Sequence, residues 1–189
     1  MDRRELLKLV AALTGSAVIG GEFFLSGCTS NDKKSTSYFS DRDVSFFDEV
    51  AETIIPKTDT PGAKDAAVGA FMASYPIDCY DESQLRTLKD GIGLLNAAAQ
   101  KKSGKNFIDL SGVDRQQLLT SIDAEAKTHE KEEADKKPNS PHYFTLMRQL
   151  ALLGFFTSKP GVTKVLRYVP VPGKYVGCID LKEGETSWA

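Results

Sequence analysis

The chain has 189 residues, with 24 Lys and Arg against 26 Asp and Glu, and a formal net charge of −2. Nucleic-acid binding requires a basic face, so this balance argues against a nucleic-acid partner. Hydrophobic residues make up 41% of the chain, which suits a soluble globular domain of a size that can bury a substantial core.

The first 27 residues are predicted to be a signal peptide that ends at a lipidation site. A twin-arginine pair, Arg3 and Arg4, precedes a moderately apolar run from Leu9 to Ile19. The sequence Leu25-Ser26-Gly27-Cys28 then resembles a lipobox, where cleavage makes the cysteine the new, lipidated N-terminus. Because two or more lipid chains give a stable anchor, we expect a membrane-anchored lipoprotein on the periplasmic side after twin-arginine export.

A single transmembrane helix is the alternative interpretation of this segment. A span needs about 20 largely apolar residues, but the window from Leu6 to Leu25 contains Lys8, Glu22 and three glycines. The pair also departs from the usual export consensus at Asp2 and Leu6, where Ser or Thr and then Phe are common. The apolar core has the length found in signal peptides, which favours export over a plain anchor.

The signal leaves two further cysteines in the mature chain. If Cys28 is lipidated, Cys79 and Cys178 remain as an even pair in an oxidising compartment, which favours a disulfide. A bridge that closes so long a loop contributes up to about 4–5 kcal/mol on the chain-entropy model. The alternative is two buried free thiols, because sequence does not show whether the sulfurs meet.

Behind the signal, residues 28–40 are predicted to form a lipidated N-terminus and polar tether, and residues 41–189 a single helical domain. The spacing of apolar residues and the capping residues predict helices over 40–55, 63–72, 81–103, 111–126, 143–156 and 158–168. The tail from Val169 onward is rich in Pro and Gly and is expected to be irregular. The fold class is therefore mainly α, a compact array of five or six helices.

Two segments of the predicted domain allow alternative interpretations. The run from Thr128 to Lys137 is almost wholly charged, which is more typical of a solvated helix end and loop than of an interaction arm. The segment from Tyr143 to Phe156 is the most apolar of the mature chain. It predicts either a central buried helix or a helix whose second face is covered by a partner protein.

The sequence carries no recognisable catalytic, cofactor-binding or metal-binding motif. His129 and His142 lie in unrelated contexts, without Cys or carboxylate at metal-ligand spacing, and we expect His129 to be exposed and His142 to be a cap or surface residue. No dinucleotide-binding, c-type haem or nucleophile-elbow motif is present. An enzyme acting alone is therefore disfavoured. Since the twin-arginine route carries folded and often cofactor-loaded cargo, we expect the signal to serve a partner.

Three blocks of the mature chain, taken in order, form a recognisable pattern. The first is IIPKTDTPGA over residues 54–63, followed by Val68-Gly69 and Phe71. The second is LALLGFFTS over residues 150–158, followed by Gly161, and the third comprises Tyr168, Val171-Pro172-Gly173, Tyr175 and Gly177-Cys178. Together they extend over most of the chain from about Ser40 to Leu181. In this order they resemble the gluconate 2-dehydrogenase subunit 3 family, the small subunit of membrane-associated sugar and sugar-acid dehydrogenases.

The resemblance implies a non-catalytic subunit with no cofactor of its own. In such complexes the large subunit is a flavoprotein of the glucose–methanol–choline type, which carries FAD, and a cytochrome c subunit commonly accepts the electrons. The small subunit supplies the export signal and helps the flavoprotein to mature. The lipobox departs from the usual pattern and adds a membrane anchor to this expectation. Related complexes oxidise other sugars, so gluconate is the family's label and not a predicted substrate.

The same blocks supply the expected partner interface. Pro56 and Pro61 fix backbone dihedral angles and Gly62 permits a tight turn, so the first block predicts a rigid loop that is suited to docking. A helix–helix connector without a partner is the alternative. Of Phe155 and Phe156, one ring is expected to fill the core and the other to anchor an interface. The expected interface residues are Pro56, Pro61, Gly62, Phe155, Phe156, Pro172 and Gly173.

Overall fold

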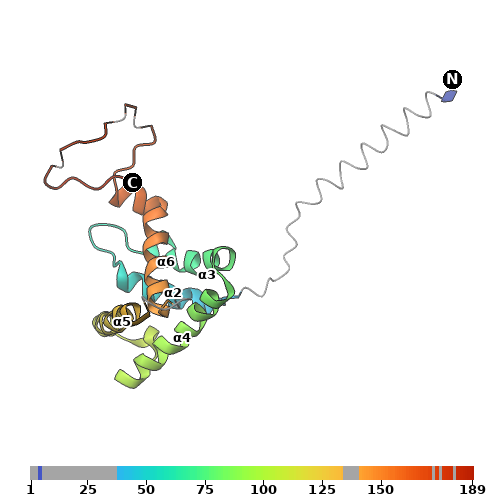
Figure 1. The fold of residues 1–189 in the computed structure, drawn as a ribbon, viewed down its shortest axis with the longest axis vertical. Helices are drawn as coiled ribbons and strands as arrows, with labels where there is room; N and C mark the ends of the chain where they lie inside the picture. Colours follow the sequence, from blue (N-terminus) through green and yellow to red (C-terminus); the bar gives the residue numbers. More distant parts are fainter. Residues whose placement is uncertain (1–3, 6–37, 134–140, 172, 175, 181) are drawn as a thin grey trace. The chain divides into compact units, whose positions relative to one another are not determined.

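The structure is a computed structural model of the chain. It describes residues 4–5, 38–133, 141–171, 173–174, 176–180 and 182–189. Met1–Ser37 and Tyr38–Ala189 form two separate units, and the second contains the helical domain (Figure 1). Most of the predicted signal peptide and tether therefore lies outside the described residues.

The described residues are mainly helical and contain no β-strand, which confirms the predicted fold class. The long helices are α2 (Asp41–Ile54), α3 (Val68–Cys79), α4 (Glu82–Ser103), α5 (Gly112–Glu133) and α6 (Tyr143–Thr157). Three short helical turns connect or follow them: η1 (Lys64–Ala66), η2 (Phe107–Asp109) and the π-helical η3 (Gly161–Val165). Within this described part, no helix is both long enough and apolar enough to cross a membrane.

Capping residues explain where two of the helices begin. Ser40 and Asp43 form a capping box, in which each side chain accepts the backbone N–H of the other. Asp81 and Gln84 form a second box at the start of α4. Each box satisfies N–H groups that have no partner within the helix, so the predicted starts of both helices are confirmed.

Both boundaries of the helix predicted over 63–72 are wrong. It does not begin at Ala63, because residues 64–66 form the 3-10 turn η1 and Ala67 adopts a left-handed backbone conformation with φ of 52°. This helix then continues through Pro76 to Cys79. α5 continues through the first part of the charged run to Glu133. The described part of that run is therefore a helix end, which agrees with the favoured interpretation.

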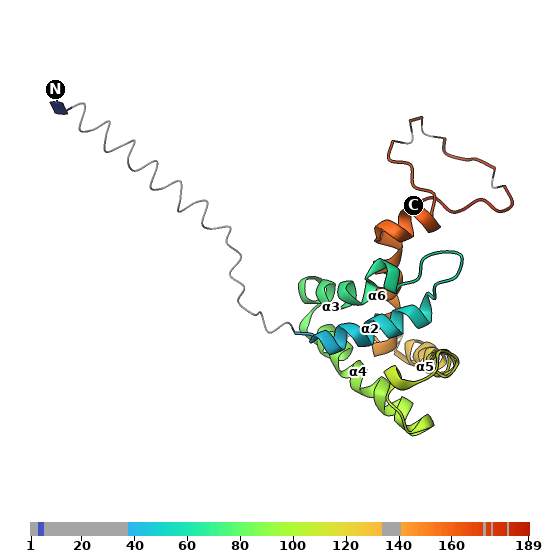
Figure 2. The ribbon, with the colours of Figure 1, turned by 180° about the vertical axis from the view of Figure 1, so that it is seen from behind.

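Helix α6 is the central helix of the domain, as the sequence predicts. It packs against α2, α3, α4 and α5, and therefore against every other long helix (Figure 1 and, from behind, Figure 2). Its buried apolar side chains are Phe144, Leu146, Met147, Leu150, Ala151 and Phe155. Burial of several such side chains, at roughly 1.5–3 kcal/mol each, makes this helix a main source of stability.

An aromatic cluster fastens the start of the domain. Phe39 lies in the range predicted to be tether, yet its side chain is buried and its ring centre is 5.3 Å from that of Phe47. The ammonium group of Lys89 lies 5.2 Å from the centre of the Phe39 ring and forms a 2.6 Å ion pair with Asp43. These contacts extend the core to the point where the tether enters the domain.

The Phe47→Ala change tests the contribution of this core to stability. Phe47 is fully buried, so we expect its truncation to lower the free energy of unfolding by about 3–5 kcal/mol. Leu94→Ala is the matched control, because Leu94 is 53% exposed and its truncation is expected to change stability by no more than about 0.5 kcal/mol. Chemical denaturation followed by circular dichroism measures both values, and equal losses would contradict the assignment.

Candidate functional site

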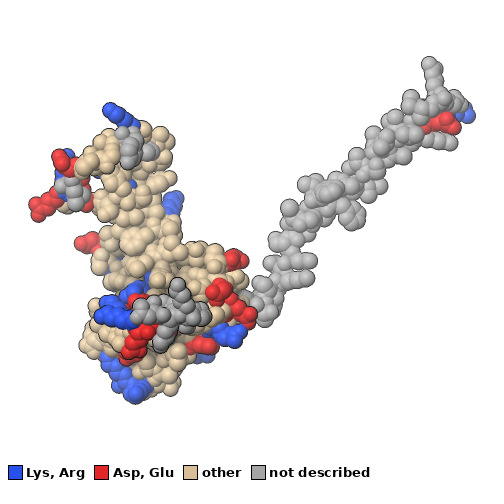
Figure 3. Space-filling model, viewed as in Figure 1, with Lys and Arg blue, Asp and Glu red and all other residues tan. Residues whose placement is uncertain are grey.

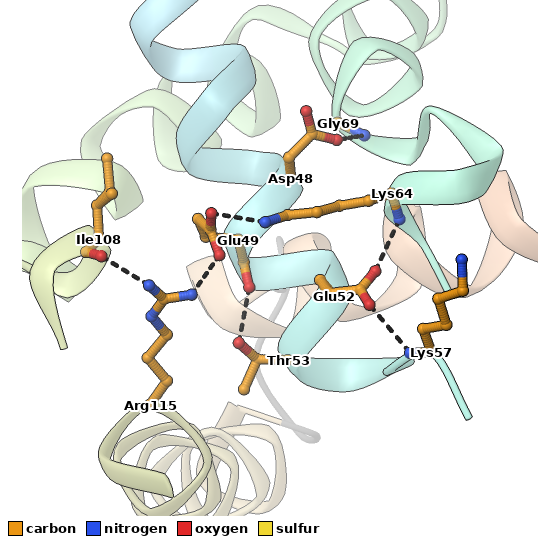
Figure 4. A network of polar contacts seen from close by, with 9 residues as sticks. All are labelled: Asp48, Glu49, Glu52, Thr53, Lys57, Lys64, Gly69, Ile108 and Arg115. Carbon is orange, nitrogen blue, oxygen red and sulfur yellow. Dashed lines mark hydrogen bonds and ion pairs between the residues drawn. The ribbon is translucent and has the colours of Figure 1, made fainter. Parts of the chain in front are cut away.

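One carboxylate closes the loop that follows α2. Glu52 accepts the backbone N–H of Lys57 at 2.9 Å and that of Lys64 at 2.8 Å (Figure 4). The Ala63 N–H also donates to the Ile55 carbonyl oxygen at 3.0 Å, and this hydrogen bond joins the two ends of the loop. The predicted rigidity of this loop therefore has a source in α2 as well as in its two prolines. We call residues 56–61 the proline loop.

Glycines are required beside the carboxylates of α2 because no side chain fits there. A Cβ atom on Gly62 would lie 2.5 Å from Glu52 Oε1 and 2.6 Å from the Lys57 nitrogen. A Cβ atom on Gly69 would overlap Asp48, which accepts the Gly69 N–H at 3.0 Å. Gly62 is thus needed for the close approach of Glu52, and not for the turn conformation on which the sequence-based prediction relied.

Glu49 connects the region of the proline loop to α5. It forms a 2.6 Å ion pair with Lys64 and a short ion pair with Arg115, which also donates to the Ile108 carbonyl oxygen at 2.6 Å (Figure 4). Partial burial raises the pKa of Glu49, but the hydrogen bonds and charges of Lys64 and Arg115 outweigh it and hold the pKa below its usual value of 4.5. The carboxylate is therefore ionised and structural at neutral pH.

The three predicted interface residues of the first block differ in accessibility. Pro56 is exposed, Pro61 is half-buried and Gly62 is buried. Pro56 and the following residues through Thr60 form the accessible tip of the proline loop. Gly62 is not accessible to a partner in this structure, because Glu52 covers its Cα.

The end of α6 separates the roles of its two adjacent phenylalanines. Phe155 is 1% exposed and fills the core, whereas Phe156 is 40% exposed. Leu152 and Leu153 are also exposed, and they share the outward face of the helix with Phe156 because their positions fall within a 100° arc. One ring therefore belongs to the core and the other is accessible, as the sequence predicts, and Phe155 is not exposed on the surface of this structure.

Two glycines shape the end of this helix. A Cβ atom on Gly154 would lie 2.6 Å from the Phe71 ring, so Gly154 lets α3 pack closely on α6. A Cβ atom on Gly161 would overlap the Phe155 carbonyl oxygen. The Gly161 N–H instead donates to the Ser158 hydroxyl at 3.1 Å, which confirms Ser158 as the residue that begins the next helical turn.

The C-terminal tail leaves the domain after η3 and returns to Arg167. The Arg167 N–H donates to the Ser187 carbonyl oxygen at 2.8 Å, and the Ala189 N–H donates to the Arg167 carbonyl oxygen at 3.2 Å. The Arg167 guanidinium lies 4.1 Å from the centre of the Trp188 ring. Gly173 has φ of 72° and open space around it. The described part of the tail is thus irregular, as predicted, but closed at its ends.

A model of the Gluconate 2-dehydrogenase subunit 3 family matches residues 41–173. The chain belongs to this family. The matched region begins at α2 and includes the proline loop, α6 and η3. No curated protein and no solved structure matches the chain. Family membership makes the chain a small subunit of such a dehydrogenase complex, an oxidoreductase, with its catalytic subunits as partners.

Several residues that were predicted to act in export, lipidation or partner binding lie outside the described residues. These are Arg3 of the export signal, Cys28 of the lipobox and Pro172 of the expected interface. Arg4 is described and exposed. The export and lipidation assignments therefore remain predictions.

Cys79 and Cys178 are both free and exposed in the structure, so the predicted disulfide is not formed. Cys79 is the last residue of α3, and Cys178 belongs to the tail. Within the part of the chain that the structure describes, the tail's backbone hydrogen bonds run to Arg167 or stay within the tail, and none runs to α3. The two thiols are also not buried, which the alternative interpretation assumed.

The two histidines lie beside each other, contrary to the prediction of unrelated contexts. Their ring centres are 5.6 Å apart, and His129 is half-buried. His142 caps α6 by accepting the Phe144 N–H at 3.2 Å, as predicted. Burial lowers the pKa of His142, and the neighbouring His129 adds to this effect. Among the described residues, no three His, Cys, Asp or Glu side chains are placed to hold a metal ion.

The burial of His129 could have been predicted from its spacing on α5, although it lies within the charged run. His129 follows the buried Ile122 and Ala126 by seven and three positions, so it lies on their face of α5. The carboxylates of Asp48, Glu49 and Glu52 were missed for a different reason. Their partners come from other elements, and sequence spacing gives no account of those partners.

The Glu52→Ala change tests closure of the proline loop in this family member. It removes the acceptor for the Lys57 and Lys64 amides, so we expect a loss of about 1 kcal/mol in stability and faster hydrogen exchange at both amides. Glu82→Ala is the control, because the ion pair that Glu82 forms with Arg86 is exposed to solvent. Unchanged exchange at the two amides would show that Glu52 does not hold the loop.

The lowered pKa of Glu49 predicts a stability change with pH. Because the folded-state pKa lies below the unfolded value, the ionised group stabilises the fold above about pH 4.5 and loses this effect as pH falls through the folded pKa. We therefore expect Glu49→Gln to be less stable at neutral pH and to lose less stability on acidification than the wild type. Denaturation series between about pH 6 and about pH 3 measure the difference. Parallel pH profiles would contradict this role.

Proposed function

We propose that this chain exports, matures and anchors the catalytic subunit of a membrane-associated, flavin-dependent dehydrogenase. The observation that carries the proposal is the family match over residues 41–173, which makes the chain a small subunit of a dehydrogenase complex. The signal motifs at Arg3, Arg4 and Cys28 support the finer role, because they give a small subunit a way to cross the membrane and remain attached.

The chemistry of the described residues supports an accessory role. A shallow groove of about 280 Å³ lies between α2, α5 and α6. Its charged side chains, Asp123 and Arg148, form an ion pair with each other, and Lys127 adds a second ion pair to Asp123 at 2.6 Å. A nucleophile or general base requires a group with a partner suited to activate it, and this groove offers structural ion pairs instead.

The proposed sequence of events follows from the order of these parts along the chain. The catalytic flavoprotein folds and takes up FAD in the cytoplasm, and the helical domain binds it there. The twin-arginine signal then directs the folded pair across the membrane. Cleavage before Cys28 and lipidation of its thiol leave the complex attached to the membrane. A cytochrome c subunit accepts the electrons of the assembled complex in this proposal, by analogy with the family.

Replacing Arg3 and Arg4 by lysine tests the carrier role. We expect the catalytic flavoprotein to remain in the cytoplasm with this chain, because the flavoprotein crosses only as its folded partner. Cell fractionation followed by immunoblotting and by dehydrogenase activity with an artificial acceptor measures its location.

Cys28→Ser is the matched control for this experiment. It should leave export intact and release the complex from the membrane fraction, since it removes only the anchor. Normal export of the flavoprotein in the double-lysine variant would refute the carrier role. A chain that purifies without any flavoprotein would favour a stand-alone envelope lipoprotein.

A further inference from the structure

The exposed apolar side chains of the domain are concentrated toward its C-terminus. Among the described residues, 13 large hydrophobic side chains are exposed, and nine of them lie between Leu152 and Trp188. The other four belong to separate segments: Tyr38, Ile77, Leu94 and Val113. Single exposed apolar residues are normal on a monomer, whereas a concentrated set marks an interaction surface.

The first part of this surface is the outward face of α6. Leu152, Leu153 and Phe156 share this face, and no charged residue occurs from Gln149 to Thr157. In the view of Figure 3 the region of α6 is mostly uncharged, whereas charged side chains gather over α4 and α5 and at the outer edge of the tail. The buried Phe155 and the tight Gly154 contact fix the helix beneath this face, so the three side chains are presented on a rigid support.

The second part is the tail, residues 167–189. Its exposed apolar side chains include Val169 and Val171, and Val171 is 82% exposed. Within the described part of residues 168–180, no backbone group hydrogen-bonds to another backbone group. A loop of this length without secondary structure is uncommon unless it has a function. Its open N–H and C=O groups can pair with the main chain of another protein.

We infer that the outward face of α6 and the tail together form the docking face for the catalytic flavoprotein subunit. This inference rests on the proposed function and adds the location of the interface. The partner surface that fits is apolar at its centre and carries acidic side chains at its edge. Lys159 and Lys174 would meet these, because neither forms an ion pair with a described residue.

The family match favours this occupant over a second copy of this chain, and charge favours it over a membrane. A membrane surface would meet the exposed carboxylates of Asp180 and Glu183 in the same tail, and the surfaces of many membranes are themselves anionic. The family match also extends over α6 and the start of the tail, and the family's complexes contain a catalytic subunit.

Photo-cross-linking in the intact complex tests this location. The full chain is co-expressed with the catalytic subunit and carries benzoylphenylalanine in place of Leu153 or Phe156, or in place of Leu94 as the control. We expect the catalytic subunit to be cross-linked from positions 153 and 156 and not from position 94. Cross-links from 153 and 156 only to a second copy, only to lipid, or to nothing would overturn the inference.

A matched pair of charge variants gives a second, independent measurement. Leu153→Glu combined with Phe156→Glu should lower the amount of co-purified catalytic subunit about tenfold or more, because both positions lie at the proposed centre of the interface. Leu94→Glu should leave that amount unchanged. Thermal unfolding confirms that the variants are folded.

The two measurements also separate the inference from the proposed function. If the wild type binds the catalytic subunit and the double variant binds it equally well, the docking face is wrong and the proposed function stands. If the wild type itself never co-purifies with a catalytic subunit, both are wrong.

Discussion

Burial of α6 against the other four long helices is the constraint on which the rest of the domain depends. The segment is too apolar to be stable in water on all sides, and its contacts with α2, α3, α4 and α5 remove most of that surface from solvent. Gly91 and Gly154 show how close the packing is, because a Cβ atom at either position would overlap an aromatic ring of Tyr143 or Phe71. The helices are therefore positioned by α6, and the outward face of α6 is what remains accessible.

Helix α2 adds a second constraint, which is polar. Its apolar face packs into the core through Phe46, Phe47 and Val50. Its carboxylates bind neighbouring chain segments through hydrogen bonds and ion pairs. Glu52 closes the proline loop, and Glu49 joins that region to α5 through Arg115. A loop held in this way keeps its shape without a partner. Its exposed tip is thus a fixed feature of the surface.

Charge is unevenly distributed over the helical domain, and this accords with the proposed role of holding another protein. Charged helices α4 and α5 lie on one side, and the uncharged end of α6 with the irregular tail lies on another (Figure 3). The described titratable groups are engaged mainly in structural contacts, such as the ion pairs of Glu49 and Asp123. The family match makes the chain part of a dehydrogenase complex, and the concentrated apolar surface is where we place its contact with the catalytic subunit.

The sequence by itself determined the mainly helical fold, the central position of α6, the capped starts of α2 and α4, and the family. These features depend on local spacing and on short motifs, which a single segment contains in full. Only the tertiary structure decided the pairing of His129 with His142, the free state of Cys79 and Cys178, and the carboxylate support of the proline loop. Each of these depends on which distant segments meet, and sequence spacing does not encode such distances. Gly62 shows the difference most clearly. Its presence was visible in the sequence, but the physical reason for it, the approach of Glu52 from the preceding helix, exists only in the folded chain.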